Sequence, residues 1–199
     1  MNYFFHNMRI GTRLALAFAL ILVLATIATG SALLAAQASA RATEQMMEEP
    51  LAKERLVSSW YTNTYSAIAR TSMIARSTDN TLSEVFAKAI ADSVTRSTEL
   101  IKKMEPLLTS PEEKAKLDSI KALRAKYQAA KVAVMDAKKA GDTAGAERLY
   151  ASEFEPAAQV YSEEVQGLLN MQREAIDAAN KAVQASFEQR ARLVLLLNG

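Results

Sequence analysis

The sequence predicts an all-α fold, an up-down-up-down four-helix bundle with long first and last helices. Three observations support this prediction. Residues that favour helices (Ala, Leu, Glu, Lys, Gln, Arg and Met) dominate the composition, whereas the 199 residues include only 6 glycines and 4 prolines. No segment alternates polar and apolar residues with the period of a strand. Clusters of turn residues divide the chain beyond its first apolar segment into four helical stretches.

The N-terminal apolar segment predicts a membrane-spanning helix at residues 14–36. No charged side chain occurs between residues 14 and 40, and a bilayer core of about 30 Å needs roughly 20 apolar residues in a helix. Arg9 and Arg13 precede the segment and would keep residues 1–13 in the cytoplasm. Ala-x-Ala patterns at its end leave a cleaved signal sequence open as an alternative, although the segment is longer than the roughly 7–15 apolar residues of such a sequence.

The first two bundle helices are expected at residues 37–78 and 81–108. A cluster of turn residues, Ser-Thr-Asp-Asn at 77–80, separates them. Thr81 followed by Glu84 has the spacing of a capping box, in which each side chain accepts a hydrogen bond from the backbone of the other residue. We therefore expect Thr81 to open the second helix.

The third helix is expected at residues 111–140. Ser110 is a preferred N-cap residue, Pro111 suits the first helical position, and two glutamates follow in the first turn. Gly141 would end the helix, with two lysines in the last turn, where the helix dipole favours cations.

The fourth helix is expected at residues 144–190, where Pro156 would kink it or separate a short first part. Outside the membrane, the first and last helices would have roughly 43 and 46 residues, or about 65–70 Å each, so both would reach the same membrane. The membrane-proximal part would then hold two helices per chain, and a homodimer is expected to complete it. Residues 191–199 are expected to start a second, truncated membrane helix.

The stretch MRIGTRLALAFALILVLATI (residues 8–27), the long helical region after it and the second apolar run resemble the sensory half of a bacterial methyl-accepting chemotaxis protein. This resemblance covers essentially the whole chain. It implies an inner-membrane anchor, a periplasmic ligand-binding domain at residues 37–190, and a signal carried by displacement of the last helix. Cytoplasmic signalling partners would act only through a C-terminal part missing from this sequence. Two alternatives stay open: the sensor domain of a histidine kinase, and a module that recognises a ligand-loaded periplasmic binding protein.

Polar residues interrupt the apolar core positions of the predicted helices at similar heights, in a zone about 12 Å tall. Three of them are cations, and buried cations need counter-charges. A small di- or tricarboxylate, such as a tricarboxylic-acid-cycle intermediate, would supply these charges through bidentate arginine contacts and hydroxyl donors. The expected ligand-binding residues are Arg70, Thr95, Arg124, Tyr127, Lys131 and Tyr161.

Three questions about these cations stay open in the sequence. Glu164, Asp92 or Asp136 could pair with them inside the bundle. Another choice of core positions on the third helix would turn Arg124 and Lys131 toward solvent, where long cationic side chains are common. Aspartate-type chemoreceptors, which this chain resembles, bind their ligand at the dimer interface through arginines late in the first helix. Here the arginines are Arg70 and Arg76, about 240° apart around a helix, so they cannot share a face. We expect Arg70 to point inward and Arg76 to lie near the dimer interface or in solvent.

The composition argues against several other classes of function. The net charge of +2 gives no footprint for nucleic-acid binding, and the chain has no cysteine. Its one histidine, His6, precedes the apolar segment, so a histidine-based metal site or catalytic site outside the membrane is not expected. No phosphate-binding loop or nucleophile motif occurs. We therefore expect no enzymatic activity, no cofactor and no metal.

Overall fold

The computed structural model describes residues 10–198, and every regular element in that range is helical. The predicted all-α four-helix bundle is confirmed. The chain divides after Met46 into an N-terminal unit and a bundle unit, which are described separately. The first nine residues of the expected cytoplasmic segment, and Gly199 at the end of the expected second membrane helix, lie outside the described residues.

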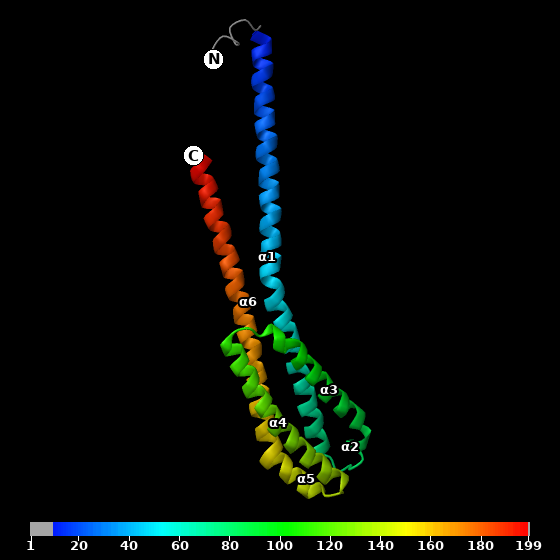
Figure 1. Ribbon diagram of the computed structural model, residues 1–199. Coiled ribbons are helices and arrows are strands. Elements are labelled where there is room, and N and C mark those ends of the chain that lie inside the picture. Colours follow the sequence, from blue (N-terminus) through cyan, green and yellow to red (C-terminus); the bar gives the residue numbers. More distant parts are fainter. Residues whose placement is uncertain (1–9, 199) are drawn as a thin grey trace. The chain divides into compact units, whose positions relative to one another are not determined.

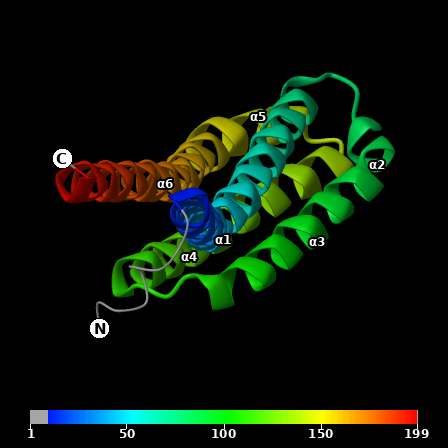
Figure 2. The same ribbon diagram turned by 90° about the horizontal axis from the view of Figure 1, so that it is seen from above.

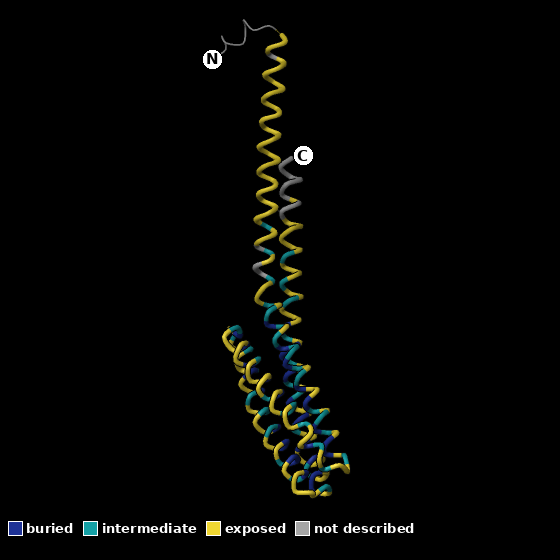
Figure 3. Tube along the Cα trace, turned by 90° about the vertical axis from the view of Figure 1, so that its right-hand side faces the viewer, coloured by how far each residue is buried: buried dark blue, intermediate teal, exposed yellow. Residues whose placement is uncertain are grey.

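The N-terminal unit contains the first part of helix α1 (Ile10–Arg76). Its apolar side chains are exposed, as the yellow trace in Figure 3 shows. Within the described residues, Ile10–Arg41 is the one helical segment long and apolar enough to cross a membrane, with a mean hydropathy of 2.3; a signal sequence would have the same properties. The hydroxyls of Thr26 and Thr29 donate to carbonyls one turn back, so they need no outside partner.

Four long helices form the bundle unit. These are α1 from residue 47 onward, α3 (Ala87–Met104), α4 (Pro111–Lys139) and α6 (Glu155–Asn198). Each runs antiparallel to the long helix before it in the chain (Figure 1), and Figure 2 shows their arrangement along the bundle. Two short helices, α2 (Leu82–Val85) and α5 (Thr143–Leu149), belong to the connections.

Aromatic side chains from α1, α4 and α6 fill the centre of the bundle. The Tyr127 ring stacks on the Tyr161 ring with 5.0 Å between centroids, and Trp60 meets Tyr161 edge-on at 6.3 Å. The indole Nε1 of Trp60 donates to the Tyr161 hydroxyl at 2.9 Å, which satisfies a polar group that burial would otherwise penalise. Aliphatic side chains extend this core along the same helices, among them Val57, Ile74, Ile120, Val134, Val165 and Leu168.

Helix α3 packs differently from the other three. Its fully buried apolar side chains, Ile101 and Met104, lie in its last turn, while Ser93 and Ser97 are the buried residues farther up. The Asn63 amide of α1 donates to the Ser93 carbonyl and the Ser97 hydroxyl, both at 2.8 Å. Along α3, small polar residues and hydrogen bonds therefore accompany half-buried apolar side chains such as Ile90 and Leu100.

The start of α4 confirms the cap expected from the sequence. The Ser110 hydroxyl accepts from the Glu113 amide, and the Glu113 carboxylate accepts in return from the Ser110 amide, which completes a capping box. The box expected at Thr81 and Glu84 is wrong. Asp79 accepts both the Thr81 amide and the Thr81 hydroxyl, at 2.8 and 2.7 Å, so that hydroxyl is already engaged.

Proline residues account for two departures from the expected helices. The second helix ends in a 3₁₀ turn (Glu105–Leu107) that contains Pro106, whereas its break at Phe86 into α2 and α3 involves no proline. A π-helical segment, Tyr150–Phe154, joins α5 to α6 directly before Pro156. Because proline has no N–H to close an α-turn, the backbone widens, and the Glu155 amide donates to the Tyr150 carbonyl five residues back.

Candidate functional site

Three cationic side chains meet inside the bundle. Arg70 comes from α1, and Arg124 and Lys131 come from α4. Lys131 is only 4% exposed, and its Nζ lies 5.7 Å from the centre of the Tyr127 ring. The two arginines are half-buried. The solvent-facing arrangement left open by the sequence therefore does not hold for Lys131.

Both guanidinium groups make their hydrogen bonds to neutral acceptors on α3. Arg124 Nη2 donates to the Thr98 hydroxyl at 2.8 Å and to the Val94 carbonyl at 3.3 Å. Arg70 Nη1 donates to the Ala89 carbonyl at 3.4 Å. Two of these three bonds exceed the usual 2.7–3.2 Å range, so they are weak.

None of the three cations forms an ion pair within residues 10–198. Two carboxylates that could have neutralised them have other partners: Glu164 pairs with Lys116 at 2.5 Å on the α4–α6 side, and Asp92 pairs with Lys88 at 2.7 Å on the surface of α3. A third, Asp136 of α4, is exposed and forms no ion pair with Lys131. The positive charge of the cluster is thus uncompensated in the described part of the chain.

The shifted pKa values follow from this arrangement. Burial, and then the nearby Arg124 and Arg70 charges, lower the pKa of Lys131 to about 8. Burial raises the pKa of the Tyr127 phenol well above its usual value. A cation this strongly destabilised by its surroundings would gain from a bound negative charge.

Two buried hydrogen-bonding atoms of the cluster have no partner among the described residues: the Nε of Arg124 and the hydroxyl of Tyr127. Buried polar atoms without partners are rare in folded proteins, because each loses its hydrogen bonds to water. One belongs to a cation of the cluster, and the other to the tyrosine beside the cations. The cluster therefore holds unused donors as well as unpaired charge.

Open space adjoins the cluster along the groove between α3 and α4. One hollow of about 240 Å³ is lined by Lys131 together with Ile90, Met135 and Asp136. A second, of about 270 Å³, is lined by Arg124, Thr98, Ile101, Lys121 and Gln128. Lys131 and Arg124 therefore border volumes that can hold a small molecule.

Comparison with known families decides what kind of module this is. A family model described as "Four helix bundle sensory module for signal transduction" matches residues 7–187. The chain belongs to this family. It is the sensory module of methyl-accepting chemotaxis proteins, as the resemblance in the sequence implied. No curated protein matches the chain.

Most of the residues expected to form the site of the sensory module do lie together. Arg70 and Arg124 lie close enough for their charges to lower the pKa values of Tyr127 and Lys131, and Tyr161 stacks on Tyr127. Burial raises the pKa of Tyr161, whose hydroxyl is occupied by the Trp60 indole. The expected residues of α1, α4 and α6 thus meet in one region of the bundle.

The structure does not bring Thr95 into this group. Thr95 is exposed, and the threonine that contacts Arg124 is Thr98, one turn farther along α3. Both threonines lie beside the buried positions of α3, so the helix pattern alone does not decide which of them reaches Arg124. The height of Arg124 on α4 favours Thr98, and this height is not visible from the α3 sequence alone.

Arg76 lies apart from Arg70, as their spacing implied. It is exposed, its guanidinium carbon lies 5.1 Å from the centre of the Tyr150 ring, and its Nη2 lies 3.9 Å from the Glu155 carboxylate. The two arginines of α1 thus have different surroundings, and only Arg70 belongs to the cation cluster of the sensory module.

Proposed function

We propose that this sensory module detects a small organic anion, a di- or tricarboxylate such as a tricarboxylic-acid-cycle intermediate, bound within one bundle. The observation that carries the proposal is the cluster of Arg70, Arg124 and Lys131, which has no counter-charge among the described residues. The sensory family supports a receptor function, and the cluster supports this class of ligand.

Electrostatics favour an anion with more than one carboxylate. A single carboxylate would leave most of the positive charge uncompensated, and unpaired charges in a protein interior cost several kcal/mol. The arginines can exchange their weak contacts with α3 carbonyls for charge-assisted bonds to carboxylate oxygens, which are roughly twice as strong. The free Tyr127 hydroxyl and Arg124 Nε would donate to the remaining oxygens.

The ligand would bias the packing of α6. Tyr127 borders the cations on one side, and on the other it stacks on Tyr161 of α6. A shift of α6 along its axis by about 1–2 Å, the usual scale of helix movements in receptors, would carry the signal toward the membrane. The ligand can move this equilibrium only by binding one arrangement more tightly than the other.

The membrane and dimer parts of the proposal rest on α1. The segment at residues 14–36 would anchor the module in a bacterial inner membrane with the bundle in the periplasm. A homodimer would cover exposed side chains of α1 in the bundle unit, such as Tyr65 and Met73, which are 65% and 49% exposed. The proposal of an anionic ligand depends on the three cations and on neither the membrane anchor nor the homodimer.

Calorimetric titration of the 199-residue chain in lipid nanodiscs tests the ligand class. We expect saturable binding of malate, citrate or succinate that Arg124→Ala abolishes. Arg148→Ala, at an exposed arginine of α5, is the matched control and should bind like the wild type. If no tri- or dicarboxylate binds, or if Arg124→Ala binds as well as Arg148→Ala, the proposed function is wrong.

A further inference from the structure

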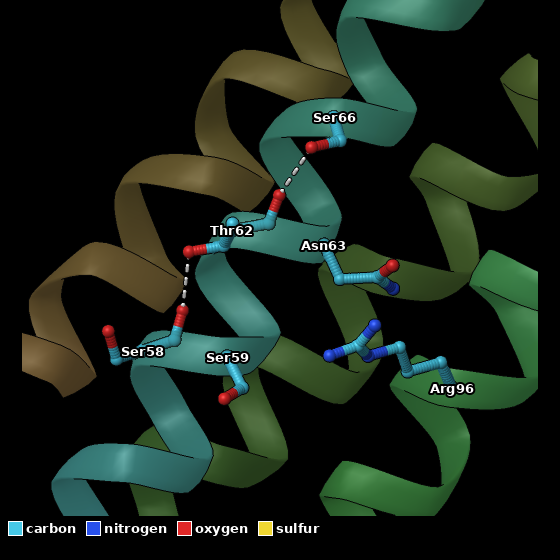
Figure 4. Close-up of a pocket in the computed structure, with 6 residues that line it drawn as sticks. All are labelled: Ser58, Ser59, Thr62, Asn63, Ser66 and Arg96. Atoms are coloured by element: carbon cyan, nitrogen blue, oxygen red, sulfur yellow. Dashed lines mark hydrogen bonds between the residues drawn. The ribbon is translucent and has the colours of Figure 1, made fainter.

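A third hollow, with a polar lining, lies between α1 and α3, and it shares no lining residue with the cation cluster. Its volume is about 250 Å³. Figure 4 shows the six side chains that line it, five from one side of α1 and one from α3, and none of them is apolar: Ser58, Ser59, Thr62, Asn63, Ser66 and Arg96. Such a lining suits a ligand that is polar over its whole surface.

Arg96 supplies the one charge of this hollow. Its side chain extends from α3 toward α1, and the guanidinium lies between Ser59 and Asn63 (Figure 4). Within residues 10–198 it forms no ion pair and donates no hydrogen bond. The nearest acidic residue before it on α3, Asp92, is paired with Lys88. The planar fork of Arg96 is therefore available for one carboxylate.

The α1 side of the hollow offers fixed oxygen atoms. Both N–H groups of the Asn63 amide have partners on α3, the Ser93 carbonyl and the Ser97 hydroxyl, so the amide is held in place and its Oδ1 remains an acceptor. The hydroxyls of Thr62 and Ser66 each donate to a carbonyl one turn back at 2.9 Å, which also leaves their oxygens as acceptors.

Ser59 adds a hydroxyl that can either donate or accept a hydrogen bond. Its hydroxyl makes no hydrogen bond to any described residue, so it can donate to a ligand or accept from one. Ligand hydroxyls, which also donate and accept, match this combination of oxygens better than a second carboxylate would. A second carboxylate would face acceptors and find no second cation.

We infer that the hollow between α1 and α3 binds a small hydroxy acid with a single negative charge. Its carboxylate pairs with Arg96, and its hydroxyls bond to Asn63 and Ser59. The volume lies below the roughly 300–1,000 Å³ typical of pockets for larger ligands, so the ligand has only a few carbons. This site has one cation and suits a singly charged anion, whereas the cation cluster has three cations and suits a multiply charged anion.

Titration of the 199-residue chain in nanodiscs with glycerate, which carries one carboxylate and two hydroxyls, tests the inference. We expect saturable binding that Arg96→Gln weakens roughly tenfold or more, the scale expected when a hydrogen-bonded charge is removed. Arg148→Gln is the matched control and should leave the affinity unchanged. Propionate, which lacks hydroxyls, should bind more weakly than glycerate. Thermal unfolding of each variant checks that the bundle is intact.

Succinate and the Lys131→Met variant separate the two sites. Lys131→Met should leave glycerate binding unchanged, and Arg96→Gln should leave succinate binding unchanged. The inference is overturned if glycerate does not bind saturably, if Arg96→Gln binds it as tightly as the wild type, or if succinate displaces it competitively. Binding of propionate equal to that of glycerate would overturn the assigned ligand class.

Discussion

The Nζ of Lys131 lies 5.7 Å from the centre of the Tyr127 ring, and no carboxylate pairs with it anywhere in the described part of the chain. The aromatic face offers an attraction of only about 0.5–2 kcal/mol, less than the cost of burying an ammonium group. Protonated Lys131 therefore destabilises the folded bundle. Four predictions follow from this lysine, from the neighbouring tyrosines and from Glu113.

The penalty at Lys131 should appear in the pH dependence of stability. Its pKa falls from an ordinary 10.5 to about 8 in the folded chain, so between these values the unfolded chain binds more protons. The free energy of unfolding should therefore rise as the pH increases from about 8 toward 10. Above pH 10 the two tyrosines Tyr127 and Tyr161, whose pKa values are raised in the folded chain, should lower the free energy of unfolding as the pH increases. Urea titrations across this range measure the curve.

Lys131→Met provides the control for that curve. The variant should lack the rise above pH 8, and at pH 7 it should be more stable than the wild type by about 1–3 kcal/mol, because an unpaired buried charge is replaced by an apolar side chain. A variant that is less stable at pH 7 and keeps the rise would show that Lys131 is not the group responsible.

Anion binding should depend on pH through the same lysine. The protonated form of Lys131 attracts a carboxylate, so the affinity for succinate should fall as the pH rises through about 8. Calorimetry between pH 6.5 and 9.5 measures this fall. Lys131→Met should bind succinate more weakly and with a flatter pH profile; an equally steep profile in the variant would contradict the role given to Lys131.

Two tyrosines that stack on each other should respond differently to loss of their hydroxyls. Tyr161→Phe leaves the buried Trp60 indole without its acceptor, which should cost about 1–3 kcal/mol of stability. Tyr127→Phe removes a hydroxyl that has no partner among the described residues, so stability should be unchanged or higher. Denaturant unfolding of both variants measures the contrast. Equal losses would mean that the Tyr127 hydroxyl has a partner after all.

Glu113 should be a stabilising carboxylate at the start of α4. It accepts hydrogen bonds from the Gln172 amide at 3.0 Å and from Lys53 at 3.3 Å, besides its part in the capping box. Burial opposes ionisation here, but these hydrogen bonds and the Lys53 charge outweigh it and lower the pKa of Glu113. Glu113→Ala should therefore cost about 1–3 kcal/mol at pH 7.

Because the pKa is lower in the folded chain, this contribution is present above the unfolded pKa of about 4.3 and is lost as the pH falls further. The difference in unfolding free energy between wild type and Glu113→Ala should therefore shrink in acid. Glu112→Ala, at an exposed position in the same turn, is the control and should cost much less. A similar loss in both variants would assign the effect to the helix dipole alone.

The sequence predicted the bundle because its turn signals are local. Ser110 and Pro111 start α4 through contacts within a few residues, and such contacts change little with tertiary packing. The choice between Thr95 and Thr98 was not predictable in the same way. Both lie beside the inner face of α3, which the buried Ile101 and Met104 mark, and only the position of Arg124 on α4 shows that Thr98 is the threonine within reach.

The cation cluster could be predicted only as one of two arrangements. Arg124 and Lys131 are seven residues apart, so they share a face of α4 whether that face is buried or exposed. The core aromatics decide between the arrangements, because Tyr127 packs against Phe154 and Tyr161 and draws the face it shares with Lys131 inward. These two aromatic side chains, one in the π-helical segment and one on α6, lie distant from Tyr127 in sequence.

The wide turn at Tyr150–Phe154 has a consequence for how such chains can change over time. A π-helical turn accommodates one more residue than an α-turn, so deletion of one residue here would restore an ordinary helix. Because the wide turn absorbs the additional residue, α6 would keep nearly the same orientation relative to α5 after the deletion. Related chains could therefore gain or lose this single residue and still present the same face of α6 to its three neighbours.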